Sequence, residues 1–327
     1  MPVVSMIMPA FNSEITIQSS IDSVVNQSFR DLELIIVDDG STDRTKEIIN
    51  QNLQQDPRIK FIQVHQAGPG GAKNVGIDHA QGQYIGFIDS DDLLDVDFIT
   101  AGVERLQAGA DCVIYDYIRF NQQEEIHNTV GDTPFTAFPA TWNKLYRSEL
   151  WTGIRFPEEI LIEDFEVVPV VVSKASKIDH IHDSFYRYRL SNNSITTSYD
   201  YKRIEELEIA LKTLVQNART LGNFEILSGK LPVFANNMMY AHIREAILSA
   251  PNHKAKRKVY RQMRVFYRQL NVEQFNIRTT IYSPNRLKQI RNNLMVICCD
   301  LGWYTLGVKV TFMIEQVFGK RRRPRRN

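Results

Sequence analysis

The sequence predicts an α/β fold in which a mostly parallel central sheet, flanked by helices, is followed by a helical C-terminal region. Two observations predict it. Short apolar runs alternate with amphipathic stretches over the first hundred residues, which indicates a parallel sheet covered on both faces. From about residue 201 the helical period continues without strand-like runs. The apolar runs occupy residues 3–8, 32–37, 59–64 and 84–88.

Each apolar run has the length of a buried strand and is bounded by polar or turn residues. The amphipathic stretches at residues 13–26 and 43–53 have helical spacing, and both are preceded by residues that favour the N-cap position. The predicted caps are Asn12 or Ser13 and then Ser41 or Thr42. Further strands are predicted at residues 112–117 and 185–190.

Charge divides the chain where the pattern changes. Residues 1–199 hold 15 Lys and Arg against 29 Asp and Glu, whereas residues 200–327 hold 24 against 9. We therefore predict one domain over residues 1–199 and a basic, mainly helical region over residues 200–327. The acidic part suits metal ions, and the basic part suits anionic partners.

Composition is ordinary for a soluble globular protein, with 43% hydrophobic and 24% charged residues among 327. Cys112, Cys298 and Cys299 do not suggest a disulfide framework, because two of them are adjacent. We recognise no secretory signal in the first residues. These features predict a cytoplasmic protein.

Polar residues follow three of the predicted strands. Ligands of such sheets bind beyond the carboxyl ends of the strands, so these three clusters are expected to converge at one edge. They are Pro9-Ala10-Phe11-Asn12, Asp38-Asp39-Gly40-Ser41 and Asp89-Ser90-Asp91-Asp92. The convergence predicts a ligand site.

The Asp89–Asp92 run predicts a metal. Like charges at short range raise one another's pKa unless a cation joins them. Mn²⁺ or Mg²⁺ prefers oxygen ligands, and Mg²⁺ binds through one or two carboxylates plus substrate phosphates. The alternative is an ordinary turn and helix cap, since Asp is common at both.

These motifs resemble family 2 glycosyltransferases with the GT-A fold. The resemblance is dense over residues 3–100 and continues through weaker landmarks at 142–147, 162–164, 186–189 and 194–196 that recur in bacterial surface-polysaccharide members. Residues 70–76 are similar to the family's Ala-Arg-Asn-x-Gly segment, but Lys73 replaces the usual Arg. That replacement keeps a cation and loses bidentate recognition.

The resemblance implies a nucleotide-sugar donor, most simply a UDP-sugar. Phe11 would stack on the base, Asp39 would accept a hydrogen bond from uracil, Asp89 would face the ribose or sugar, and Asp91 would ligate the metal, with Asp89 as a second ligand. Lys144 and Arg189 would meet diphosphate or acceptor oxygens, and ordinary surface salt bridges are the alternative for both. The implied donor-binding residues are Pro9, Ala10, Phe11, Asn12, Asp39, Lys73, Asn74, Asp89, Ser90, Lys144 and Arg189.

The resemblance also implies the chemistry. In Glu163-Asp164, Asp164 would be the general base that deprotonates an acceptor hydroxyl, and the alternative is that both residues cap a helix. Attack from the face opposite the diphosphate predicts inversion at the anomeric carbon. The acceptor would be a hydroxyl of a glycan or of a lipid-linked saccharide.

The C-terminal region predicts contact with an anionic membrane surface at the inner face of the cell membrane. Six basic residues recur at helical spacing: Lys254, Arg257, Lys258, Arg261, Arg264 and Arg268. Residues 294–318 are mostly apolar but contain three charges, which favours an interfacial helix over a spanning one. The basic segment 320–326 follows. The alternatives are a solvated helix face and a packing or homo-oligomer interface; no nucleic-acid module is recognised.

Three other function classes were weighed. A sugar nucleotidyltransferase would carry a Gly-rich loop with a basic residue after the first strand, and Pro9-Ala10-Phe11-Asn12 has neither. A dehydrogenase would carry G-x-G-x-x-G there. A non-catalytic subunit that supports a partner transferase would be expected to lose carboxylates, whereas Asp39, Asp89, Asp91 and Asp164 are all present.

Overall fold

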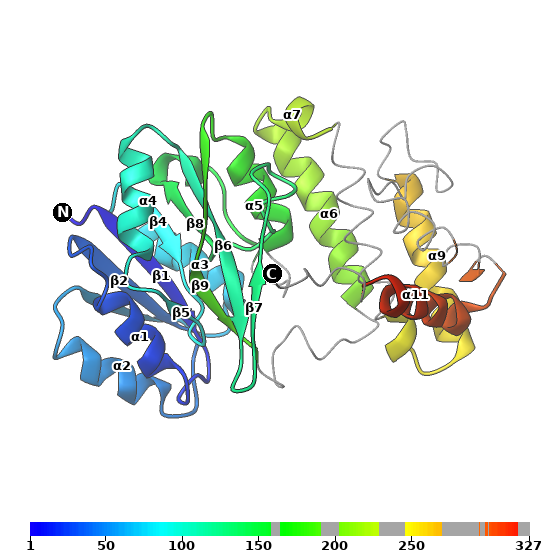
Figure 1. Cartoon of the computed structure of the whole chain (residues 1–327), viewed down its shortest axis with the longest axis horizontal. Coiled ribbons are helices and arrows are strands. Elements are labelled where there is room, and N and C mark those ends of the chain that lie inside the picture. Colours follow the sequence, from blue (N-terminus) through cyan, green and yellow to red (C-terminus); the bar gives the residue numbers. More distant parts are fainter. Residues whose placement is uncertain are drawn as a thin grey trace, which may run out of the picture. The chain divides into compact units, whose positions relative to one another are not determined.

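The computed structural model is shown in Figure 1. The residues it describes are 1–157, 164–190, 203–228, 246–269, 294, 298–299 and 301–319. They belong to two compact units, the first made of Met1–Asn192 with Thr213–Asn223 and the second of Asn193–Lys212 with Phe224–Asn327. The domain boundary at residue 199 stays a prediction.

In the first unit, strands and helices alternate up to residue 107. These elements are β1 (Val4–Ala10), α1 (Ile17–Val25), β2 (Leu32–Asp38), α2 (Thr45–Leu53), β3 (Ile59–Gln63), α3 (Gly68–His79), β4 (Tyr84–Phe87), β5 (Leu93–Leu94) and α4 (Phe98–Gln107). Then follow β6 (Cys112–Phe120), β7 (Glu125–Asn128), β8 (Lys144–Arg147), the 3-10 helix η1 (Ser148–Trp151), α5 (Asp164–Ser173) and β9 (Ile178–Arg189). Helix α6 (Arg203–Thr220) has residues in both units.

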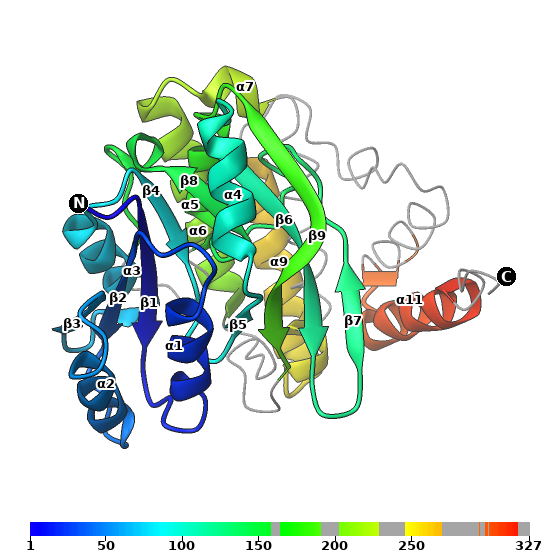
Figure 2. The same ribbon diagram turned by 60° about the vertical axis from the view of Figure 1, so that its left-hand side comes forward.

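The strands form one nine-stranded sheet in the order β3-β2-β1-β4-β8-β6-β9-β5, with β7 paired to β6. Strand β1 pairs in parallel with β2 and β4, and β2 pairs in parallel with β3. Strand β8 lies antiparallel between β4 and β6, and β6 and β9 run side by side in parallel (Figure 2). The predicted α/β sheet is confirmed, and it is mixed because β8 joins two parallel parts.

Helices cover both faces of this sheet. Met6 and Met8 of β1 are fully buried in a core to which α1, α2 and α4 contribute. Ile35 and Val37 of β2 pack instead with Ala72 of α3. Strands buried on both faces explain why the first strands read as continuous apolar runs rather than alternating ones.

The four N-terminal strands predicted from sequence are confirmed to within two residues at each end. Both helix starts were predicted too early, because α1 begins at Ile17 and α2 at Thr45. The N-cap positions are Thr16 and Arg44, so the predicted caps are wrong. The side chains expected to cap these helices bond between loops instead. Helix α3 was not predicted, since its glycines obscure the helical pattern.

Helix α3 packs so closely on β1 that Gly76 cannot carry a side chain. A Cβ atom at Gly76 would lie 2.3 Å from Cγ2 of Ile7. We expect Gly76→Ala to lower the free energy of unfolding by about 1–3 kcal/mol through overpacking, as measured by chemical denaturation. In an Ile7→Ala background the same change should cost much less. Equal costs in both backgrounds would contradict this account.

The second unit contains α7 (Phe224–Ser228), α9 (His253–Gln269) and α11 (Tyr304–Gly319). Within α9, Lys254, Arg257 and Lys258 are exposed while Val259 and Tyr260 are buried, which makes this part of the helix amphipathic. The side chains of Arg264 and Arg268 and the segment 320–326 lie outside the described residues. No helix in the described part of the chain combines the length and the apolar character needed to cross a membrane.

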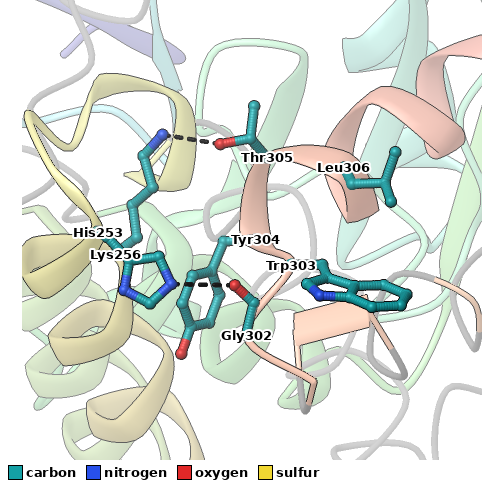
Figure 3. Close-up of a pocket in the computed structure, with 7 residues that line it drawn as sticks. All are labelled: His253, Lys256, Gly302, Trp303, Tyr304, Thr305 and Leu306. Carbon is teal, nitrogen blue, oxygen red and sulfur yellow. Dashed lines mark hydrogen bonds between the residues drawn. The ribbon is translucent and has the colours of Figure 1, made fainter.

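A pocket of about 380 Å³ lies between α9 and the start of α11 (Figure 3). His253 and Lys256 line it from α9, and residues 302–306 line it from the turn into α11. Lys256 Nζ donates to Thr305 Oγ1 at 2.9 Å, which joins the two sides. Trp303 is 57% exposed beside the pocket and Leu306 is 50% exposed.

Candidate active site

Three loops meet at the carboxyl edge of the parallel strands β1, β2 and β4. Asn12 N donates to Ser41 Oγ at 2.9 Å, and Thr42 N donates to Asn12 Oδ1 at 2.9 Å. Ser13 Oγ lies 2.7 Å from Ser90 Oγ. These bonds join the ends of all three strands. The predicted convergence of the three polar clusters is therefore confirmed.

The loop after β1 presents an aromatic ring to solvent. Phe11 is 58% exposed, although a large apolar side chain gains free energy from burial. Asn12 has a φ of 48°, a left-handed conformation that Asn adopts more readily than most residues. The Ala10 side chain is buried and that of Pro9 is half-buried, so these two shape the loop from beneath. An exposed ring beside a polar loop suits the base-stacking role predicted for Phe11.

Asp39 caps the start of α3. Its Oδ1 accepts from the backbone N–H of Ala67 at 2.7 Å, and its Oδ2 accepts from that of Gly68 at 2.8 Å. A carboxylate at a helix N-terminus satisfies amides that have no partner within the helix. Each oxygen keeps a free lone pair for a further donor, so the predicted contact with a uracil N–H remains chemically open to Asp39.

Three carboxylates gather directly after β4. Asp89, Asp91 and Asp92, here called the aspartate cluster, each offer an oxygen within 4.8 Å of the other two. Burial raises the pKa of Asp91, and the charge of Arg189 only partly offsets it. Burial, together with the neighbouring charges of Asp91 and Asp89, raises the pKa of Asp92 well above its usual range. The surroundings of the cluster therefore disfavour the charged forms of Asp91 and Asp92.

A hard divalent cation bound here would stabilise the charged forms of these carboxylates. Asp92 Oδ1 accepts from Arg189 N at 2.7 Å, and its Oδ2 accepts from the Tyr186 hydroxyl at 2.7 Å. Its oxygens are thus partly occupied, which favours a supporting role for Asp92. Asp91 and Asp89 are left as the residues that would hold Mn²⁺ or Mg²⁺, as predicted.

Tyr186 is a site residue whose contacts the sequence did not reveal. Besides donating to Asp92, its hydroxyl lies 3.3 Å from the backbone N of Asp89, which donates to it. Trp142 stacks on the Tyr186 ring at 4.3 Å between centroids. The segment around Tyr186 was singled out as a family landmark, but only the pairing of β5 with β9 shows which aspartates it meets.

Arg189 ends β9 next to the aspartate cluster. Its Nε donates to the backbone oxygen of Asp91 at 2.6 Å, and its guanidinium carbon lies 5.0 Å from the centre of the Phe120 ring. These contacts fix the guanidinium beside the cluster. The position is compatible with the predicted contact to a diphosphate, because a guanidinium has five N–H donors.

Asp164 and Lys73 form a second part of the candidate site. Lys73 Nζ donates to Asp164 Oδ1 at 2.7 Å, and the two side chains are only 4% and 17% exposed. Thr141 N donates to Asp164 Oδ2 at 3.2 Å, and the Lys73 ammonium lies 5.2 Å from the Phe156 ring centre. Lys73, which replaces the family's Arg, thus forms an ion pair with Asp164, the predicted general base. A direct contact of Lys73 with the donor does not fit this geometry.

Two other donor-binding predictions also disagree with the structure. Lys144 is fully buried, and its ammonium donates to Phe138 O, Ala140 O and Asn143 Oδ1 at 2.6–2.8 Å, which uses its three hydrogens internally. The Asn74 side chain exchanges two hydrogen bonds of 2.8 Å with the backbone of Phe156. Both residues support the site rather than line it. Glu163 lies outside the described residues.

Lys144 predicts a pH dependence of stability. Burial lowers its pKa from 10.5 to about 7. Between pH 7 and about 9 the unfolded chain binds more protons at Lys144 than the folded one, so stability should rise with pH, by up to about 1.4 kcal/mol per pH unit; above pH 9 the raised pKa of buried Cys112 opposes this rise. We expect urea unfolding at several pH values to give this slope in the wild type and the Lys46→Met control, and to lose it in Lys144→Met. A slope retained in Lys144→Met would contradict this assignment.

Solved structures share this architecture. S. aureus TarS 1–349 in complex with UDP-GlcNAc aligns with a TM-score of 0.60 over 99% of this chain and 93% of that chain, at 17% identity. The mannosyltransferase PcManGT from Pyrobaculum calidifontis, in complex with GDP-Man and Mn²⁺, aligns with a TM-score of 0.51 over 98% and 88%, at 14% identity. At such identities the likeness shows the fold alone, and it confirms the predicted GT-A fold.

Sequence relatives are bacterial glycosyltransferases. Glycosyltransferase GlyG of Streptococcus pneumoniae is 30% identical over 226 residues, which are 61% of this chain and 74% of that protein. GlyA of the same organism is 26% identical over 243 residues, and this chain spans only 35% of its length. A Campylobacter jejuni GalNAc(5)-diNAcBac-PP-undecaprenol beta-1,3-glucosyltransferase is 30% identical over 212 residues, 60% of this chain and 68% of that protein.

Residues 5–172 match the sequence profile described as Glycosyl transferase family 2. The match spans β1 to α5 and so includes the three joined loops, the aspartate cluster and Asp164. This chain belongs to glycosyl transferase family 2.

Proposed function

We propose that this protein is an inverting, metal-dependent glycosyltransferase that moves a hexose or N-acetylhexosamine from a nucleotide-diphosphate sugar to a hydroxyl group. The observation that carries the proposal is the aspartate cluster, in which three carboxylates lie close together and burial raises the pKa of two of them, Asp91 and Asp92, next to the loops of Phe11 and Asp39. A bound divalent cation supplies charge stabilisation for the leaving diphosphate. Asp91 and Asp89 would hold it.

Asp164 is the proposed general base. The acceptor oxygen attacks the anomeric carbon, Asp164 takes its proton, and the bond from that carbon to the diphosphate breaks with its electron pair leaving on the nucleotide. Asp164 is 17% exposed, and its two carboxylate oxygens accept hydrogen bonds from Lys73 Nζ and Thr141 N. These bonds hold the side chain in one orientation. Lys73 is the positioning residue that provides one of these bonds. A positioned base contributes about 10²–10⁴-fold to such a reaction.

The proposed donor carries UDP. Phe11 offers an exposed ring for stacking, Asp39 offers a carboxylate at the base-binding end, and Arg189 offers donors beside the aspartate cluster. The structural neighbour TarS is described in complex with UDP-GlcNAc and with UDP, which supports this choice of nucleotide. Mn²⁺ is the ion we expect to support activity best, with Mg²⁺ as the alternative.

The proposed acceptor is a glycan or a lipid-linked saccharide of the cell envelope, reached at the inner face of the membrane. One relative is named for a PP-undecaprenol-linked substrate, which supports a lipid-linked acceptor. The exposed basic face of α9 and the exposed Trp303 and Leu306 suit peripheral contact with an anionic bilayer. An interface with a second copy of the chain is the other use we propose for these surfaces.

A panel of nucleotide sugars tests the proposal. Purified protein with Mn²⁺ is incubated with UDP-, GDP-, ADP- and TDP-sugars without acceptor, and the released nucleotide is quantified. We expect hydrolysis of at least one UDP-hexose or UDP-N-acetylhexosamine above the rate with chelator. Formation of nucleoside triphosphate and sugar 1-phosphate when pyrophosphate is added, rather than release of nucleoside diphosphate, would indicate a nucleotidyltransferase. Failure to bind or hydrolyse any donor would favour a non-catalytic subunit.

A further inference from the structure

A second group of metal-ligating side chains lies on β6 and β9, apart from the aspartate cluster. Asp116 of β6, with His180 and His182 of β9, is here called the His–Asp cluster. Each of its residues offers a ligand atom within 4.8 Å of the other two. His180 and His182 alternate with Ile181 on one strand, so both imidazoles extend from the same face.

The His–Asp cluster sits where the pairing of β6 with β9 changes register. Tyr115 pairs with Ile181, but Tyr117 pairs with Tyr186, so the strands are out of step between these positions. Asp116 is the β6 residue at this irregularity. β-Bulges re-aim side chains and are over-represented next to functional sites. Ile114 pairs with His180 before this point, so Asp116 lies beside the two histidines where the regular pairing ends.

The distances suit a small transition-metal ion. His180 Nε2 lies 2.9 Å from Asp116 Oδ1, and His182 Nδ1 lies 3.5 Å from Asp116 Oδ2. Bonds of about 2.0 Å in a tetrahedral zinc site place ligand atoms roughly 3.3 Å apart, so each of these two His–Asp distances differs from that separation by only a few tenths of an ångström. The imidazole ring centres are 4.2 Å apart.

Burial divides the cluster into a fixed part and an open part. The side chains of Asp116 and His180 are 6% and 12% exposed, whereas that of His182 is 76% exposed. Val130 N also donates to Asp116 Oδ1 at 3.0 Å, which orients the carboxylate. Asp116 and His180 thus form a buried pair of ligands, and His182 lies at the surface. An ion can reach the pair from solvent, and a water molecule can occupy a further coordination position. A hydrogen-bonded His–Asp pair alone explains His180 but not the approach of exposed His182.

We propose that the His–Asp cluster binds a divalent transition-metal ion of the zinc type, through His180, His182 and Asp116. Two imidazoles and one carboxylate are a ligand set typical of Zn²⁺ and unlike the all-carboxylate aspartate cluster, which favours Mn²⁺ or Mg²⁺. The ion is expected to tie β6 to β9 across the register change. The His–Asp cluster shares no residue with the aspartate cluster.

Cobalt and zinc binding to the intact protein test this inference. Co²⁺ is added to metal-free wild type, and the visible absorption of tetrahedral cobalt is followed, after which Zn²⁺ is titrated in to displace it. We expect one equivalent bound at this site and at least about 10²-fold weaker binding in His182→Ala, since even second-shell losses cost 10–100-fold in metal affinity. His182 is exposed, so this variant should fold normally. Asp116→Asn should behave alike.

Two controls isolate the site. His79→Ala removes another exposed histidine, whose Nδ1 is hydrogen-bonded to Val75 O. This variant should bind cobalt like the wild type. Asp91→Asn should also retain the cobalt band, which keeps this test independent of the proposed transferase site. An absent tetrahedral band in the wild type, or equal zinc affinity in the wild type and His182→Ala, would overturn the inference.

Discussion

Asp164→Asn is expected to lower the rate of sugar transfer by about 10²–10⁴-fold while leaving donor affinity unchanged. The amide keeps the shape of the side chain but cannot accept the acceptor proton. Asp164 is proposed to contact the acceptor and not the nucleotide, so the substitution should lower kcat. Steady-state kinetics, with donor binding measured by calorimetry, would check both parts.

The same substitution removes the carboxylate that pairs with Lys73, in a site where Lys73 is 4% exposed, so folding has to be checked separately. Asp56→Asn is a matched control, because Asp56 also pairs with a cation, Arg58, at 2.6 Å, but at the start of β3. It should keep full activity. If Asp164→Asn folds and transfers sugar at the wild-type rate, Asp164 is not the base.

Asp91→Asn is expected to abolish the stimulation of donor hydrolysis by Mn²⁺. Several kcal/mol of charge stabilisation would be lost with the ion, which corresponds to about 10²–10⁴-fold in rate. The variant should remain folded and gain stability near neutral pH, because burial already disfavours the charged form of Asp91. Hydrolysis rates across a Mn²⁺ titration, together with thermal unfolding of the metal-free protein, would measure both effects.

Asp97→Asn controls for the loss of a nearby carboxylate. Asp97 precedes α4 and accepts from Ser28 Oγ at 2.7 Å, outside the aspartate cluster. Its Mn²⁺ response should equal that of the wild type. An unchanged Mn²⁺ response in Asp91→Asn would remove Asp91 from the metal site, whatever happens in the control.

The parallel half of the fold could be predicted because its strands are buried on both faces. Residues 32–37, for example, form a continuous apolar run whose structure as β2 follows from length and flanking turns. Strand β8 could not be predicted in this way. Only four residues long, it lies antiparallel between β4 and β6, and its partners are distant in sequence. Its Lys144 also has the polar character of a surface residue although it is fully buried.

The carboxyl-edge half of the candidate site was predictable for a related reason. Phe11, Asp39 and Asp91 each follow a recognisable strand, and the topology of parallel strands brings such positions together. The contacts of Lys73 and Asn74 were not predictable, because they depend on where Phe156 and the first residue of α5, Asp164, lie relative to α3. Contacts between residues distant in sequence, rather than the local sequence pattern, determine whether a lysine such as Lys73 is buried or exposed.

The configuration of the sugar released during donor hydrolysis shows whether the reaction inverts the anomeric carbon. Proton NMR spectra recorded within minutes of mixing an α-linked UDP-sugar with the protein and Mn²⁺ distinguish the first-formed anomer before mutarotation. A single displacement at the sheet edge, with water in place of the acceptor hydroxyl, predicts the β anomer first. Initial release of the α anomer would contradict an inverting reaction that uses Asp164 as its base.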